Sequence, residues 1–235
     1  MGDEQVILKE IFGYDSFRPG QGELVDAILS GHDVLGIMPT GAGKSICYQV
    51  PALCMNGITL VVSPLISLMK DQVESLVQAG VAAAYLNSSL TPGQQRTVLA
   101  RAAEGRYKIM YVAPERLNTD SFLRWACSAP IDMVTVDEAH CISQWGKDFR
   151  PGYLGIADFL HALPERPLVS AFTATATDRV RQDIVSALEL QDAKVLVTGF
   201  DRPNLYFEVR RPKSKPAALL QAIREQGDSS GIVYC

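Results

Sequence analysis

The sequence has no long hydrophobic run, few histidines and no excess of positive charge, and each of these scarcities excludes a class of protein. No apolar stretch reaches the roughly 20 residues that a membrane-spanning helix needs. Three histidines and five cysteines without C-x-x-C spacing predict no metal cluster, and the cysteines are interpreted as buried side chains in a reducing compartment. A net charge of −4 excludes a wholly basic coat for nucleic acid, so contacts with phosphate backbones must come from a local patch.

Short apolar runs alternate with helical segments along the chain. The runs are almost continuously apolar, as expected of strands that are buried on both faces of a parallel sheet. They cover residues 34–38, 59–63, 83–86, 109–112, 133–136, 168–172 and 195–197. Between them, Thr91-Pro92-Gly93-Gln94 predicts a helix that starts with a capping box. This alternation predicts an α/β fold, with a parallel sheet flanked by helices on both faces.

A second, shorter segment is predicted after residue 200. The 235 residues suffice for one full α/β domain and part of another. We expect a boundary near residues 200–204, a strand over Leu205–Val209, a helix that carries Leu219, Leu220 and Ile223, and a further apolar run over 231–235. Because a domain does not normally end within a buried strand, residues 1–200 are interpreted as one domain and residues 201–235 as the truncated start of a second.

A glycine-rich loop, Met38–Ser45, follows the first predicted strand and precedes a helix. Such a loop lets backbone N–H groups approach phosphates at the positive end of a helix. Lys44 is expected to reach the β- and γ-phosphates of ATP, and the Ser45 hydroxyl to bind Mg²⁺. The general pattern has glycine where this chain has Met38, so the loop departs from it at its first position. The alternative is a glycine-rich turn that happens to precede Lys-Ser. The predicted phosphate contacts are Thr40, Gly41, Ala42, Gly43, Lys44 and Ser45.

Two carboxylates, Asp137 and Glu138, end the predicted strand 133–136, at the sheet edge where ligands bind in open parallel sheets. Asp137 is expected to hold Mg²⁺, and Glu138 to orient and partly deprotonate the attacking water. Taken alone, such a pair is also a common surface turn. His140 is either a structural histidine or a sensor that links the γ-phosphate to neighbouring loops, and we favour the sensor.

Together these segments resemble the RecQ family of superfamily 2 DNA helicases. Family-like motifs occur in order at residues 12–21, 38–45, 63–72, 113–117, 137–140, 141–151, 173–177, 200–204 and 231–235. The segment His140–Pro151 is the most diagnostic, because RNA-directed relatives share the acidic pair but not this loop. The resemblance implies a RecA-like P-loop NTPase lobe over residues 1–200 and the start of a second RecA-like lobe over 201–235.

The first motif resembles an adenine-binding segment. Tyr14 offers a ring and Arg18 a guanidinium plane that can stack on a base, and Gln21 has the donor and acceptor that match adenine. Phe17 is interpreted as a core aromatic.

The loop from Cys141 to Pro151 carries Trp145 and Phe149 beside Lys147 and Arg150, which suits stacking on bases with positive charge nearby. The alternative for Phe149 is a packed loop anchor. The resemblance implies that Gln144, Trp145, Phe149 and Arg150 sense single-stranded DNA, and that Thr173 and Thr175 couple hydrolysis to movement. Lys70 could touch a DNA phosphate or be solvated, and the two remain open.

The resemblance further implies an ATP- and Mg²⁺-dependent DNA helicase that moves 3′ to 5′ along single-stranded DNA and unwinds forked duplexes in DNA repair and recombination. We expect no membrane partner and a cytoplasmic, nucleoid-associated location. In the family a second lobe supplies arginines to the γ-phosphate, so this chain alone is predicted to hydrolyse ATP very slowly. The alternatives are an RNA-directed helicase of the same superfamily and an ATP-gated nucleic-acid-binding lobe without catalysis.

Overall fold

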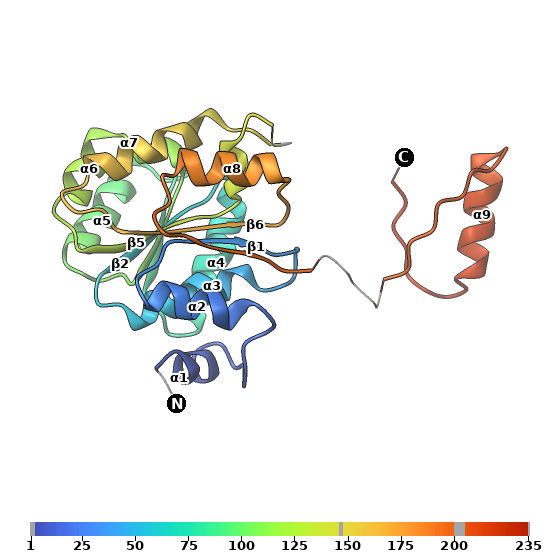
Figure 1. Cartoon of the computed structure of the whole chain (residues 1–235), viewed down its shortest axis with the longest axis horizontal. Helices are drawn as coiled ribbons and strands as arrows, with labels where there is room; N and C mark the ends of the chain where they lie inside the picture. The colour runs from blue at the N-terminus through green and yellow to red at the C-terminus, as the bar shows by residue number, and fades with distance from the viewer. Residues whose placement is uncertain (1–2, 146–147, 200–204, 235) are drawn as a thin grey trace. The chain divides into compact units, whose positions relative to one another are not determined.

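The computed structural model describes residues 3–145, 148–199 and 205–234. The chain divides into two compact units, Met1–Phe200 and Asp201–Cys235, and each is described by itself (Figure 1). No helix among the described residues combines the length and the apolar character needed to cross a membrane.

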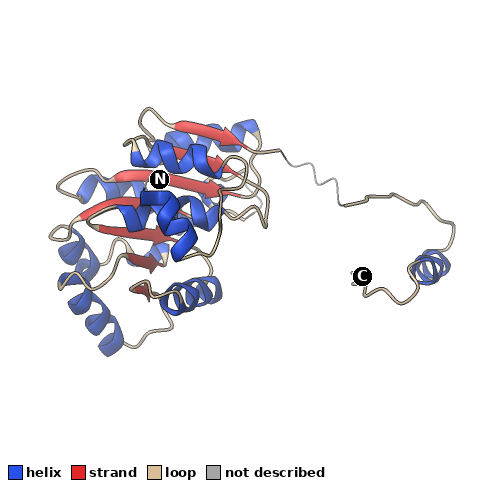
Figure 2. Cartoon of the chain, turned by 90° about the horizontal axis from the view of Figure 1, so that it is seen from below, coloured by secondary structure: helices blue, strands red, loops and turns tan. Residues whose placement is uncertain are grey.

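A parallel sheet forms the centre of the first unit (Figure 2). Within the described residues it has seven strands in the order β3-β4-β2-β5-β6-β1-β7. They are β1 (Val34–Ile37), β2 (Ile58–Val62), β3 (Ala83–Leu86), β4 (Ile109–Val112), β5 (Ile131–Val136), β6 (Leu168–Thr173) and β7 (Lys194–Val197). All neighbouring pairs are parallel. The seven predicted strands and the α/β fold are confirmed, and no strand end differs from its prediction by more than two residues.

Helices cover both faces of this sheet because alternate residues of each strand point to opposite sides. The helices are α1 (Asp3–Glu10), α2 (Gln21–Leu29), α3 (Lys44–Cys54), α4 (Ile66–Gln78), α5 (Pro92–Ala103), α6 (Asp120–Ala126), α7 (Gly155–Ala162) and α8 (Asp178–Ala187). Short 3-10 turns lie at Pro114–Arg116, Ala139–Ile142 and Pro151–Leu154. One apolar core joins Leu35, Leu60 and Val134 to α6, α7 and α8, and the other joins Val34, Val61 and Met133 to α2, α3 and α4. Figure 1 shows these two groups of helices on opposite sides of the sheet.

The predicted capping box is present at the start of α5, and a glycine follows the end of α2. The Thr91 side chain accepts from the Gln94 N–H, and the Gln94 side chain accepts from the Thr91 N–H, which completes the capping box of α5. Gly31 follows α2 with a φ of 84°, a backbone conformation that glycine adopts without steric cost.

Asp33, directly before β1, fastens three segments at the amino end of the sheet. Its side chain is 3% exposed and forms a two-point ion pair with Arg166, with Nη2–Oδ2 and Nη1–Oδ1 distances of 2.6 and 3.2 Å. It also accepts from the backbone N–H of Val169 in β6 at 2.8 Å and from that of Gln191 before β7 at 2.7 Å. One carboxylate thus aligns β1, β6 and the turn that leads into β7.

The second unit contains α9 (Lys215–Glu225), as predicted from its apolar stripe. The predicted strand over Leu205–Val209 is wrong, because these residues form no regular structure, and neither do the described residues 231–234 of the last apolar run. A strand needs a neighbour to pair its N–H and C=O groups, and none lies beside these segments among the described residues. Tyr206, Phe207 and Val209 are more than 80% exposed. The predicted boundary and motif at 200–204 lie outside the described residues, as does Cys235.

Candidate nucleotide-binding site

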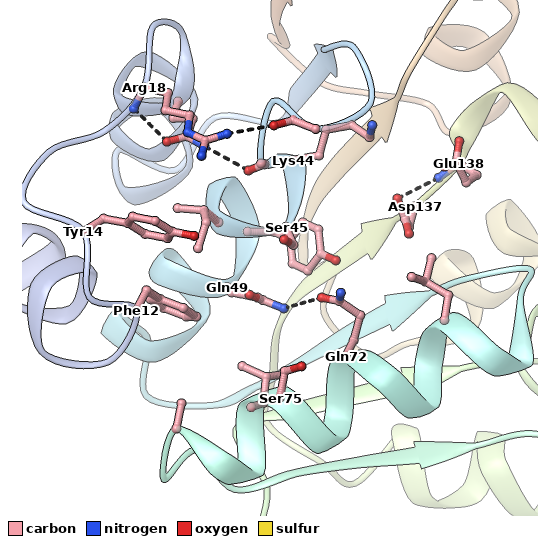
Figure 3. A pocket seen from close by; sticks show the side chains of 18 of the residues that line it. Phe12, Tyr14, Arg18, Lys44, Ser45, Gln49, Gln72, Ser75, Asp137 and Glu138 are labelled. Carbon is pink, nitrogen blue, oxygen red and sulfur yellow. Dashed lines mark hydrogen bonds between the residues drawn. The ribbon is translucent and has the colours of Figure 1, made fainter. Parts of the chain in front are cut away.

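A cleft of about 580 Å³ lies at the carboxyl ends of the strands (Figure 3). This volume suits a small-molecule ligand. The loop Met38–Ser45 follows β1 and the carboxylates follow β5, and only β6 separates the two strands. The predicted residues that line the cleft are Tyr14, Arg18, Gln21, Gly41, Gly43, Lys44, Ser45, Asp137 and Glu138. Thr40 is exposed and Ala42 half-buried, next to this lining.

The glycine-rich loop needs its glycines. Gly41 and Gly43 have φ values of 83° and 79°, in the left-handed region. A Cβ on Gly43 would lie 2.5 Å from the Gln21 amide nitrogen. Helix α3 begins at Lys44, directly after Gly43, so its free N–H groups and positive end face the cleft region.

The loop is held from outside by Arg18 and by Gln21, the first residue of α2. The Gln21 amide nitrogen donates to the carbonyls of Ala42 and Gly43, both at 3.0 Å. Arg18 donates from Nη1 to the Gly41 carbonyl at 2.7 Å, and its backbone N–H donates to the Gln21 side-chain oxygen at 2.8 Å (Figure 3). Three successive loop carbonyls are therefore fixed before any ligand arrives. Both ends of the Gln21 amide are engaged, so a contact with adenine would require these bonds to exchange.

Tyr14 and Arg18 form the outer end of the cleft. The Tyr14 side chain is 47% exposed, and the Arg18 guanidinium carbon lies 6.0 Å from the centre of its ring. A flat ring beside a flat cation is a surface on which a nucleobase can stack. Phe17 is half-buried against the small core of α1, α2 and α3, in keeping with its interpretation as a core aromatic.

Lys44 and Ser45 occupy the inner part of the cleft. The Lys44 ammonium donates to the Met38 carbonyl at 3.2 Å, which keeps it folded over the loop. Ser45 lies in the first turn of α3 and lines the same cavity as the acidic pair.

Asp137 is 7% exposed, and its Oδ1 accepts the backbone N–H of Glu138 at 3.0 Å. Burial, and then the charge of Glu138, raise the pKa of Asp137 to about 6. Glu138 has a φ of 48°, a left-handed conformation that costs a non-glycine residue of order 1–3 kcal/mol. This turn carries the chain at once from β5 into the 3-10 turn Ala139–Ile142. A hydrogen bond from His140 lowers the pKa of Glu138, so this carboxylate is ionised at neutral pH.

His140 connects the acidic pair to the segment after β6. Its Nδ1 lies 2.8 Å from the Thr173 hydroxyl and 3.3 Å from Glu138 Oε2. The Thr173 hydroxyl donates onward to the Thr175 carbonyl at 3.2 Å, and the Thr173 carbonyl accepts the Met38 N–H at 3.0 Å. Contacts with the Cys141 sulfur and the Glu138 carboxylate raise the pKa of His140 to about 10, so the ring carries a proton on each nitrogen at neutral pH.

The aromatic loop lies beside this network. Trp145 is 63% exposed, with the Arg179 guanidinium 3.6 Å above its ring, whereas Phe149 is half-buried. Gln144 is exposed, and Arg150 donates to the Pro64 carbonyl at 2.8 Å, which joins the loop to the segment after β2. Gly146 and Lys147 lie outside the described residues.

Sequence reasoning missed a polar cluster on the cleft floor. Gln49 of α3 donates from Nε2 to Gln72 Oε1 of α4 and to the Tyr111 hydroxyl of β4, both at 3.0 Å, and the Tyr48 and Tyr111 hydroxyls lie 3.3 Å apart. Burial raises the pKa of both tyrosines, so they stay neutral. Positions 48 and 49 follow Lys44 by about one helical turn, and this spacing is the signal that could have found them.

Sequence reasoning also missed Tyr153, which bonds to the backbone of the acidic pair. The buried Tyr153 hydroxyl donates to the Asp137 carbonyl at 2.8 Å. Tyr153 follows the aromatic loop directly, so the loop and Asp137 share this support.

Comparisons with known proteins agree with this geometry. Residues 18–184 match the family model described as DEAD/DEAH box helicase. The chain is 47% identical to the ATP-dependent DNA helicase RecQ of Pasteurella multocida, over 97% of this chain and 36% of that protein. It is 44% identical to the protein of the same name from Bacillus subtilis, over 98% of this chain and 39% of that protein. The chain thus spans less than half of these relatives. The crystal structure of the DUF1998 helicase MrfA has the same fold, with a TM-score of 0.73 and 14% identity over 97% of this chain and 37% of that one.

Proposed function

Since the chain belongs to the DEAD/DEAH box helicase family, we propose that it is the nucleotide-binding lobe of an ATP-dependent DNA helicase similar to RecQ. The observation that carries this proposal is the single cleft that contains Lys44 and Ser45 at the start of α3 and Asp137 and Glu138 after β5. A phosphate cradle and a pair of carboxylates in one cavity are what nucleoside triphosphate hydrolysis requires.

The chemistry of the donor atoms fits a magnesium ion. Asp137 and the Ser45 hydroxyl are oxygen donors that line the same cavity, and burial disfavours the Asp137 charge unless a cation offsets it. We infer that Ser45 and Asp137 would hold Mg²⁺, which would offset the negative charge of the bound triphosphate.

The other cleft residues then have defined tasks. Lys44 leaves the Met38 carbonyl to contact the β- and γ-phosphates, while Gly41, Ala42, Gly43 and the neighbouring Thr40 surround them. Glu138 is ionised and accepts a proton from the attacking water as it orients it.

At the outer end of the cleft the adenine base stacks on Tyr14 beside Arg18, and Gln21 exchanges its bonds with the loop for bonds to adenine. Support comes from the exposed ring of Tyr14 and from the continuity of the cleft between Tyr14 and Lys44.

Single-stranded DNA is the polymer that the lobe grips. Gln144, Trp145, Phe149 and Arg150 form the sensing loop, and His140, Thr173 and Thr175 relay its state to the acidic pair. The support is the unbroken set of contacts from Glu138 through His140 and Thr173 to Thr175. Duplex unwinding at forks with 3′ to 5′ movement, action in repair and recombination, and a location on the bacterial nucleoid belong to this proposal for the whole protein.

A second RecA-like lobe, which begins within residues 201–235, completes the motor. An arginine supplied from such a lobe accelerates phosphoryl transfer by about 10³ to 10⁵, which corresponds to about 4–7 kcal/mol of barrier. The lobe alone therefore binds Mg-ATP weakly, hydrolyses it very slowly and does not unwind duplex DNA.

The test is Glu138→Gln in the full-length protein, with Glu165→Gln, an exposed residue before β6, as the matched control. We expect normal binding of a fluorescent ATP analogue and a loss of at least 100-fold in DNA-stimulated ATP hydrolysis, with the control unchanged. Full hydrolysis by Glu138→Gln would show that this carboxylate is not catalytic. Absence of hydrolysis by the wild-type full-length protein would leave only an ATP-gated binding lobe. Equal stimulation by RNA and DNA strands of the same length would favour an RNA-directed helicase.

A further inference from the structure

One face of the exposed aromatic ring in the loop is already occupied. The Arg179 guanidinium carbon lies 3.6 Å from the centre of the Trp145 ring, which is the distance of direct stacking. The corresponding distance between Arg18 and Tyr14 is 6.0 Å. Trp145 is nevertheless 63% exposed, so the ring is accessible around this contact.

Arg179 has no competing acidic partner in the described part of the chain. It forms no ion pair there, whereas Arg181, two residues further along α8, pairs with Asp178. The Arg179 guanidinium is therefore held by the Trp145 ring alone among the described groups. An exposed cation–π contact is weaker than the stacking of a nucleobase on an aromatic ring, so a base can displace the arginine from this face.

The backbone beneath the ring is anchored independently of this contact. The Trp145 N–H donates to the Ser143 hydroxyl at 3.2 Å, and that hydroxyl donates to Asp183 Oδ2 at 2.6 Å. Asp183 and Arg179 lie one turn apart on α8. The ring can thus change its stacking partner while the loop stays attached to the same helix.

The position of Arg179 in the fold connects this exchange to the nucleotide site. Helix α8 starts at Asp178, directly after the segment 173–177, and Thr173 contacts His140 at 2.8 Å. A change in the contacts of Arg179 therefore acts on the first turn of α8, directly after the segment 173–177.

We propose that Arg179 is a reversible cap on Trp145, and that single-stranded DNA displaces it. Without DNA the guanidinium covers one face of the ring. A nucleobase takes that face, and the freed guanidinium binds a backbone phosphate of the same strand. Arg179 is thus a positioning and DNA-binding residue, and the inference rests on the proposed function because it needs DNA at this loop.

The resting contact is tested by tryptophan fluorescence of the 235-residue chain, which has two tryptophans. Trp125 is 7% exposed, so quenching by acrylamide reports mainly on Trp145. We expect Arg179→Ala to raise the quenching constant by uncovering the ring. The matched control is Arg96→Ala, an exposed arginine of α5. It should leave the quenching unchanged, and circular dichroism verifies that each variant is folded. An unchanged quenching constant for Arg179→Ala would refute the cap.

The phosphate contact is tested by the salt dependence of oligothymidylate binding. Loss of one phosphate contact on a single strand reduces the slope of log K against log salt by about 0.7. We expect this reduction in Arg179→Ala, and retention of the wild-type slope in Arg179→Lys, which keeps the charge but not the planar stack. An unreduced slope in Arg179→Ala would overturn the exchange. A wild-type chain that binds no oligothymidylate at low salt would instead contradict the proposed function, while the quenching experiment still decides whether the ring is capped.

Discussion

Replacing Asp33 by Asn should destabilise the first unit strongly without changing its site. The variant keeps the shape of the side chain but removes its charge. Both carboxylate oxygens now accept hydrogen bonds from N–H groups, so the new NH₂ group must face a donor with which it cannot bond. Removing one partner of a buried ion pair costs about 3–5 kcal/mol. The Arg166 side chain is 29% exposed, so water recovers part of its solvation, and we expect a loss of about 2–4 kcal/mol.

Urea unfolding followed by circular dichroism measures this loss. With slopes of about 1–3 kcal/mol per molar urea, the midpoint should fall by about 0.7–4 M. A double-mutant cycle with Arg166→Gln should give a coupling of at least about 1 kcal/mol, because the two side chains touch. Glu165→Gln, next to Arg166 and exposed, is the control. A loss below about 1 kcal/mol, or additive losses in the cycle, would refute the reasoning. Binding of a fluorescent ATP analogue by the folded variant should equal that of wild type.

Three further outcomes follow from the site. Gly43→Ala should weaken binding of the ATP analogue at least tenfold by titration, since the added Cβ would displace the Gln21 amide and strain a left-handed residue; unaltered binding would contradict this. Tyr111→Phe leaves Gln49 short of one partner and should lower the free energy of unfolding by about 1–3 kcal/mol in urea, and a neutral effect would show that water replaces the hydroxyl. The raised pKa of His140 means that its stabilisation is complete below about pH 6.5 and is lost as pH rises through about 10. The difference in melting temperature between wild type and His140→Gln should therefore shrink from pH 6 to pH 10, and a constant difference would exclude this linkage.

The sequence predicted the sheet well because its strands are buried on both faces. Runs such as 109–112 and 83–86 are apolar throughout, and they match β4 and β3 without any shift. The convergence of Lys44 and Asp137 also followed from general physics, since parallel strands deliver their carboxyl ends to one edge.

Other features depend on partners that the local sequence does not specify. The apolar run 205–209 was predicted as a strand, yet strand formation requires a neighbouring ladder, which no property of these five residues supplies. The bonds from Gln21 to the loop join positions more than 20 residues apart and have no local signature. The stacking of Arg179 on Trp145 could not be predicted from the sequence either, because the sequence does not specify which group an exposed arginine side chain contacts.

Because β6 lies between β1 and β5, its last residue contacts both sides of the cleft. Thr173, its last residue, is bonded through its carbonyl to Met38 and through its hydroxyl to His140. A ligand that contacts both the loop after β1 and the carboxylates after β5 must therefore extend across the carboxyl end of β6. A displacement of the loop after release of a phosphate, or a rearrangement at Glu138, would therefore alter a hydrogen bond of Thr173. The strand order thus brings contacts from the loop after β1 and from the turn after β5 together at one residue, Thr173.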